Sequence, residues 1–115
     1  MLIKNNAIPS VVEIEINGEV TEDEMNEFET YIKQKVEEHG KLNALIVIKD
    51  LDYTVEGFIE EIKFDIKHLD DFNKVALVSD EKWIELGEKL STFMPSVDAE
   101  HFDPDERQKA MAWLS

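Results

Sequence analysis

Apolar and polar residues follow one another at two different spacings along the chain, one typical of strands and one typical of helices. Between residues 11 and 17 every second residue is apolar, and Glu13 and Glu15 stand between them. This alternation predicts a strand with one face buried and the other exposed to solvent. Two other segments are continuously apolar, as expected of strands covered on both faces. The expected strands are Val11–Asn17, Ala44–Ile48, Val75–Val78 and Val97–Phe102, with Met1–Lys4 as a candidate neighbour of the first.

Helical spacing begins after Gly18, which ends the first strand. Thr21 and Glu24 have the spacing of a capping box, in which the threonine hydroxyl accepts from a backbone N–H and the glutamate reaches back to the cap. Gly40 stands where a helix C-terminus favours a left-handed residue. We therefore expect the first helix at about Glu22–His39.

Three further helices are expected. The second runs from near Thr54 to about Asp71, with an apolar residue every three or four positions. Ser79 or Asp80 caps the third helix. The last begins with Asp103 at the cap and a proline at the first helical position. The third helix carries Trp83, Leu86, Gly87 and Leu90 on its inner face, with Ile84 outside it.

This order of elements predicts an α/β fold. Strands that alternate with helices form sheets with parallel central strands and right-handed crossovers. Because the strand with Glu13 and Glu15 alternates, we expect a mixed sheet rather than a fully parallel one. The expected architecture is a mixed sheet of four to five strands flanked by four helices. At 115 residues the chain has the size of one domain, so residues 1–115 are predicted to form a single domain.

The charge of the chain narrows the classes of partner. It has 27 acidic and 12 basic residues, a formal net charge of −15. This charge disfavours nucleic acids, whose phosphates must be neutralised by Lys and Arg, and it disfavours anionic membrane surfaces. No segment approaches the roughly 20 apolar residues of a membrane helix, and the first residues lack the pattern of a signal peptide. We therefore expect a cytoplasmic protein without an integral membrane segment.

Motif-based enzyme classes find little support. The chain has no cysteine, which excludes disulfides, thiolate nucleophiles and cysteine-ligated zinc. Its four glycines form neither a P-loop nor a dinucleotide fingerprint, and no Gly-x-Ser-x-Gly elbow occurs. Asp65 and His68 lie three residues apart and share a helix face, but a metal site needs at least one more ligand. We expect no enzymatic activity, no cofactor and no metal.

Several stretches together resemble the SpoIIAA-like proteins, which are related to STAS domains. The resemblance spans nearly the whole chain and implies a mixed sheet flanked by helices, without enzymatic activity. The group is also similar to lipid-carrying CRAL-TRIO domains, which implies an apolar ligand site as an alternative. The matching stretches are Ile16–Thr21, Phe64–His68, Lys74–Val78, Trp83, Phe102–Asp103 and Ala110–Leu114.

The resemblance also implies a position for regulation. In the related anti-sigma-factor antagonists, a serine at the start of the second helix is phosphorylated, and this prevents binding to a partner kinase. Thr54 matches that serine by location. The Asp-Ser-Ser-Gly signature of the antagonists is missing here, and only Thr54 and Gly57 resemble it. Thr54 is therefore a candidate phosphorylation site by position alone.

Large apolar residues outnumber those that the helical faces require. If some are exposed together, they form a partner or ligand surface; otherwise they fill the seams between helices. The residues are Tyr53, Phe64, Phe72, Trp83, Ile84, Phe93, Met94 and Trp113.

Open α/β sheets usually bind their ligands at the carboxyl ends of their parallel strands. The leading hypothesis is a non-enzymatic binding or regulatory module that contacts a protein partner or a second copy in a homodimer. The alternative is a carrier or sensor of a small apolar, lipid-like ligand, which requires an enclosed apolar cavity. The candidate binding residues at the strand ends are Asp50, Asp52, Tyr53, Thr54, Ser79, Asp80 and Trp83.

Overall fold

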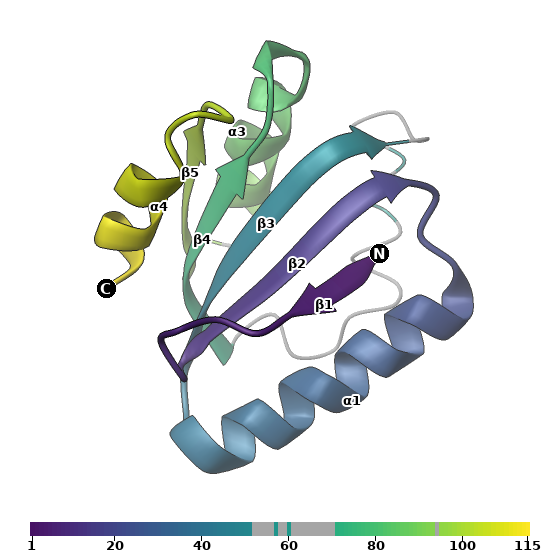
Figure 1. Cartoon of the computed structure of the whole chain (residues 1–115), viewed down its shortest axis with the longest axis vertical. Helices are drawn as coiled ribbons and strands as arrows, with labels where there is room; N and C mark the ends of the chain where they lie inside the picture. The colour runs from purple at the N-terminus through teal and green to yellow at the C-terminus, as the bar shows by residue number, and fades with distance from the viewer. Residues whose placement is uncertain (52–56, 58–59, 61–70, 94) are drawn as a thin grey trace.

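In the computed structural model, the strands form one five-stranded sheet in the order β1-β2-β3-β4-β5 (Figure 1). The structure describes residues 1–51, 57, 60, 71–93 and 95–115. The first pair of strands is antiparallel and the other three pairs are parallel, which confirms the predicted mixed sheet. The strands are β1 (Leu2–Lys4), β2 (Val11–Gly18), β3 (Leu42–Leu51), β4 (Phe72–Val78) and β5 (Asp98–Phe102).

The strand β3 is longer than the apolar run that predicts it, and it contains a bulge near its carboxyl end. Ile16 pairs with Ile48, but the next residue, Asn17, pairs with Asp50. Lys49 is therefore an extra residue in β3. A β-bulge of this kind changes the direction of nearby side chains and is frequent beside functional sites.

The helix α1 (Glu22–His39) has the predicted bounds and caps. The Thr21 hydroxyl accepts a hydrogen bond from the Glu24 backbone N–H at 3.2 Å, and the Glu24 carboxylate accepts from the Thr21 N–H at 2.9 Å. Gly40 has a φ of 74° and donates its N–H to the carbonyl of Val36. The capping box therefore forms as the sequence predicts.

The third expected helix is preceded by a single 3₁₀ turn, η2 (Glu81–Trp83), which leads directly into α3 (Ile84–Phe93). Of the two candidate caps, Asp80 has this role, because its carboxylate accepts from the Lys82 N–H at 3.0 Å. Leu86 and Leu90 are buried and Ile84 is exposed, as predicted.

The last helix, α4 (Arg107–Leu114), begins later than predicted. Asp103 and Glu106 form a separate turn, in which each backbone N–H is bonded: the Asp103 N–H donates to the Glu106 carboxylate and the Glu106 N–H to the Asp103 carbonyl, both at 2.9 Å. Glu106 has φ −105° and ψ 23°, which is not helical and separates this turn from α4. The predicted start at Asp103 was therefore wrong.

The second expected helix, at about residues 54–71, falls mostly outside the described residues. Within that range, Gly57 and Glu60 are described, and both have helical backbone. Of the four expected helices, the described part of the chain contains α1, α3 and α4.

The two faces of the sheet belong to different packing layers. Helices α1 and α3 contribute to the hydrophobic core on one face, and α4 lies against the opposite face (Figure 1). The core on the first face includes Val12, Ile14, Ile16, Phe28, Ile32, Ala44, Ile48, Val75, Leu77, Trp83, Leu86 and Leu90. The core beneath α4 consists of Val11, Leu45, Ala76, Val78, Phe102, Ala110 and Leu114.

Candidate functional site

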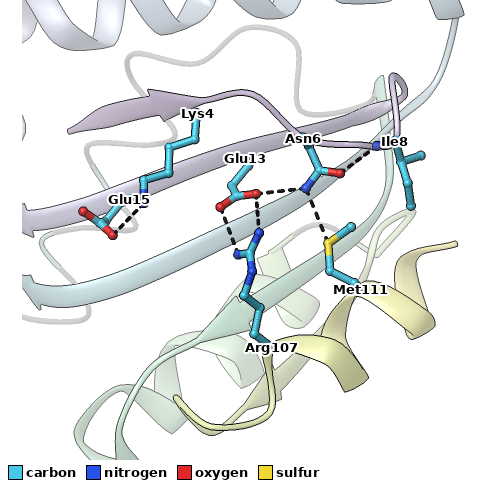
Figure 2. Close-up of polar contacts among 7 residues, drawn as sticks. All are labelled: Lys4, Asn6, Ile8, Glu13, Glu15, Arg107 and Met111. Atoms are coloured by element: carbon cyan, nitrogen blue, oxygen red, sulfur yellow. Dashed lines mark hydrogen bonds and ion pairs between the residues drawn. The ribbon is translucent and has the colours of Figure 1, made fainter.

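An ion pair with a buried carboxylate joins β2 to the first turn of α4. Glu13 was predicted to face solvent, but only 3% of it is exposed. The Arg107 guanidinium lies over it in a bidentate arrangement, with Nη1 2.9 Å from Oε2 and Nη2 2.8 Å from Oε1 (Figure 2). The prediction was wrong because α4 packs against this face of the sheet and covers the carboxylate with a matching cation.

Asn6 completes the polar cluster. Its Nδ2 donates to Glu13 Oε1 at 2.9 Å, and its Oδ1 accepts from the Ile8 N–H at 2.9 Å (Figure 2). The same Nδ2 lies 3.4 Å from the sulfur of Met111. Among the described residues, every fully buried side-chain nitrogen or oxygen has a hydrogen-bond partner. The segment between β1 and β2 is therefore attached to both the sheet and α4.

The surroundings of Glu13 favour its ionised form. Burial alone would raise the pKa of this carboxyl. The hydrogen bonds from Arg107 and Asn6, with the positive charges of Arg107 and Lys4, outweigh burial and hold the pKa below its ordinary value. The hydrogen bond to Glu13 in turn raises the pKa of Arg107. At neutral pH the pair is therefore fully charged.

A groove of about 460 Å³ opens beside this pair, on the α4 face of the sheet; we call it the Arg107 groove. Across its floor, Lys4 Nζ contacts Glu15 Oε1 at 3.2 Å. Lys49, the extra residue of the bulge, is exposed at its rim. The chain's single arginine therefore lies in a groove with two lysines, in an otherwise acidic protein. The lining residues are Lys4, Asn5, Glu13, Glu15, Val47, Lys49, Val78, Pro104 and Arg107.

The Arg107 groove lies beside the carboxyl ends of β3 and β4, the strand ends at which we predicted the binding residues. Val47 and Lys49 belong to the carboxyl half of β3, and Val78 is the last residue of β4. Asp50 is exposed next to Lys49, and Asp80 is exposed and serves as the cap of η2. Asp52, Tyr53 and Thr54 lie outside the described residues, so their predicted roles stay predictions.

Two of the predicted site residues point into the protein. Ser79 is 1% exposed; its hydroxyl lies 2.9 Å from His101 Nε2 and donates to the Asp80 carbonyl at 3.1 Å. Trp83 is buried in the core with α3, and Lys82 Nζ lies 5.0 Å from its ring centre. The structure thus gives both residues a packing environment and places neither on an open surface.

The Ser79 and His101 pair is the arrangement closest to a nucleophile with its base among the described residues. Such a pair needs hydrogen-bond reach, which 2.9 Å provides, and also access for a substrate. The buried hydroxyl lacks that access. Asp65 and His68, the other candidates for chemistry, lie outside the described residues. Within the described ranges, no group of three or more His, Cys, Asp or Glu is arranged to hold a metal ion.

The surplus large apolar residues have different environments. Phe72 and Trp83 are buried, Ile84 is exposed, and Trp113 is half-buried against Phe102, with ring centres 5.9 Å apart. Tyr53, Phe64 and Met94 lie outside the described residues, and the side chain of Phe93 is also not described. These residues therefore do not form one exposed cluster in the described part of the protein.

The residues that form the Arg107 groove were missed by sequence reasoning. Glu13 was assigned to a solvated strand face, and Arg107 was assigned no role. The available signal was weak: a glutamate within an apolar strand, and a single arginine in the first turn of the last helix. Nothing in the local pattern indicates that these two residues, 94 positions apart, are partners.

Together, the mixed sheet and the helices on both of its faces define an α/β domain of the STAS type. None of the described helices has the length and apolar character needed to cross a membrane. The chain belongs to the SpoIIAA-like family, which it matches over residues 11–115. No curated protein and no solved structure matched the chain. Family membership confirms the resemblance and supports a regulatory or binding module.

Proposed function

We propose that the chain is a non-enzymatic binding module that contacts a protein partner through the Arg107 groove. The observation that supports this most strongly is the bidentate pair of the buried Glu13 carboxylate and the half-exposed Arg107 guanidinium. Ion pairs with a buried member contribute little net stability compared with apolar packing, and in some proteins they are retained because they confer specificity. Here the pair holds the end of α4 against β2 and gives the groove a defined shape.

The charges of the groove indicate the kind of contact. Arg107 and Lys4 each have a carboxylate partner, and Lys49 is exposed beside them. Partner recognition depends on complementary charges, which favour the right partner and repel others. We infer that a partner places a carboxylate next to Lys49. The net charge of −15 repels acidic surfaces overall, so contact with an acidic partner requires a local group of cations such as Arg107, Lys4 and Lys49.

The burial of Ser79 supports a non-enzymatic role. A nucleophile must reach its substrate, and the Ser79 hydroxyl is enclosed and bonded to the Asp80 carbonyl. We expect a cytoplasmic protein that works through contacts, with a second copy of the chain as the other candidate partner. In that case light scattering would report about twice the chain mass of 13.3 kDa.

Site-specific crosslinking in the native host tests the proposal. A photoreactive amino acid replaces Lys49 at the rim of the groove in one variant, and Lys33, which is exposed on α1, in the control. We expect position 49 to capture one discrete protein, identified by mass spectrometry, and position 33 not to capture it. Charge reversal, Lys49→Glu, should abolish co-purification of that protein, while Lys33→Glu should not.

Two outcomes would contradict the proposal. Equal capture from both positions would show that the groove is not the contact site. A reproducible substrate turnover that Ser79→Ala removes would show that the chain is an enzyme. A crosslink between two copies of this chain would instead identify the homodimer as the assembly.

A further inference from the structure

Within the described part of the chain, the strand β5 forms an open edge of the sheet. It pairs with β4 on one side, and the sheet order places no described strand on its other side. The Phe102 carbonyl accepts from the Ser79 N–H at 3.1 Å, so Phe102 points its backbone groups toward β4. Successive residues of a strand point these groups to opposite sides. Ala99 and His101 therefore direct their N–H and C=O groups away from β4, toward the open edge.

A hollow of about 420 Å³ follows this edge. Ser91 of α3 borders it on one side and Trp113 of α4 on the other, with Val97–Glu100 along its floor. Ser91 Oγ donates to the Ala99 carbonyl at a long 3.4 Å, which a backbone N–H of an added strand can replace. Helices therefore flank the edge on both faces of the sheet but leave room along it.

The acidic side chains at this edge favour a basic binding partner. Asp98 and Glu100 are both exposed and lie on the α4 face, whereas Ala99 lies on the α3 face. Lys74 pairs across from Asp98 in β4, but its Nζ donates to the Trp113 carbonyl at 2.9 Å and lies 5.3 Å from the Trp113 ring centre. An added strand would place every second side chain beside Asp98 and Glu100, where a cation is favoured.

We infer that the open edge of β5 binds an extended segment of a partner protein, which joins the sheet as an additional strand. The segment carries Lys or Arg at alternate positions on the α4 side and small apolar residues on the α3 side. Main-chain hydrogen bonds to Ala99 and His101 supply affinity, and the alternating side chains supply specificity. The inference does not depend on the Arg107 groove, which lies on a different part of the sheet.

A second copy of the chain fits this edge poorly. A two-fold antiparallel pair that uses all five residues of β5 would centre on Glu100 and place it opposite its own copy. Like charges directly opposite one another destabilise a strand pair, and each copy also carries a net charge of −15. A basic segment meets neither penalty.

Backbone NMR with a defined peptide tests the inference. The probe is a capped seven-residue peptide of alternating lysine and valine, and its control has glutamate in place of lysine. With the lysine peptide at saturation, we expect amide exchange at Ala99 and His101 to slow by about tenfold, as a new ladder protects them. The glutamate peptide should leave both amides unchanged. Binding that perturbs α1 but not these amides would overturn the inference.

Two variants separate strand addition from general charge attraction. Ala99→Pro removes an N–H that faces the open edge and leaves the bonds to β4, so the lysine peptide should no longer bind. If this variant does not fold, the second variant decides. The double variant Asp98→Lys, Glu100→Lys should reverse the peptide preference, so that the glutamate peptide binds and the lysine peptide does not. Glu37→Lys on α1 is the matched control and should retain the lysine peptide.

The same measurements exclude the alternatives. Loss of binding in Glu37→Lys equal to that in the β5 variant would indicate non-specific attraction and contradict the inference. Protection of Ala99 and His101 that grows with protein concentration, without peptide, would show that a second copy occupies the edge.

Discussion

The two faces of the sheet differ in what covers them. On the α1 and α3 face, Val12, Ile14 and Ile16 of β2 are all buried in one hydrophobic core. On the α4 face, apolar residues of β3 and β4 and Val11 at the start of β2 are buried beneath the helix, whereas the rest of this face carries Lys4, Glu13 and Glu15. One face therefore serves packing throughout, and the other divides into a packed half and a charged half.

This difference shows that a polar residue on a strand need not face solvent. Glu13 is as well buried as its apolar neighbours, because Arg107 and Asn6 meet its charge and its hydrogen-bonding needs. Glu15, two residues further along β2, keeps partial contact with solvent and contacts Lys4. The charged half of the α4 face is therefore formed jointly by β1 and β2 from one end of the chain and by α4 from the other.

The largest expected effect comes from the packed face. Leu77→Ala removes a fully buried side chain from the α1 and α3 core. We expect it to lower the free energy of unfolding by about 3 kcal/mol, through lost apolar burial and the cavity that remains. Urea denaturation measures this. Leu2→Ala, at a residue that is 54% exposed, is the control and should change stability little. Equal effects would contradict the assignment of the core.

The next effect tests the charged half. Arg107→Ala leaves the buried Glu13 carboxylate without its main partner. Loss of one partner of a fully buried pair costs about 3–5 kcal/mol. Because the Arg107 side chain is 49% exposed and water can enter, we expect about 2 kcal/mol. Lys109→Ala, two residues along α4 and also ion-paired, is the matched control and should have little effect.

A smaller effect should appear as a difference in pH dependence. The pKa of Glu13 is lower in the folded protein than its ordinary value of about 4.5. The stability from its ionised form is therefore present above that value and is lost as the pH falls through the folded-state pKa. Glu13→Gln should be less stable than the wild type at pH 7, and the two stabilities should converge in acid. If the stabilities of the wild type and of Glu13→Gln changed with pH in parallel, Glu13 would not be ionised and paired in the folded protein.

The smallest expected effect separates stability from function. Replacing both Glu13 and Arg107 with leucine removes the two charges together and substitutes apolar packing. Buried pairs replaced in this way are often neutral for stability. We expect an unfolding free energy near that of the wild type in urea denaturation, but loss of the protein captured from position 49. If the double variant still captured that protein, the ion pair would not be required for binding.

Most of the fold could be predicted because its signals are local. The capping box of Thr21 and Glu24, the glycine after α1 and the apolar runs in β3 and β4 each act within a few residues. The start of α4 was less predictable, because Asp103 and Glu106 make the expected bond within a separate turn. A cap sequence thus indicates a turn but does not ensure that the helix continues from it.

The candidate site could not be predicted in the same way, because its contacts are distant in sequence. Alternation in β2 correctly separates its two faces, but it cannot show which face a later helix will cover. Lys49 reaches the groove through a bulge, which shifts the register between β2 and β3. The rule that α/β proteins bind at strand ends led to Asp50, next to the proposed groove, but also to the buried Ser79 and Trp83.

The most direct test of this account is an NMR titration of the Glu13 side-chain carboxyl carbon in the folded wild-type protein. The charged half of the α4 face depends on an ionised Glu13 that is bound by Arg107. We expect the pKa of Glu13 to lie below about 4.5, and to rise when Arg107 is replaced by alanine. A value at or above 4.5 that Arg107→Ala leaves unchanged would contradict it.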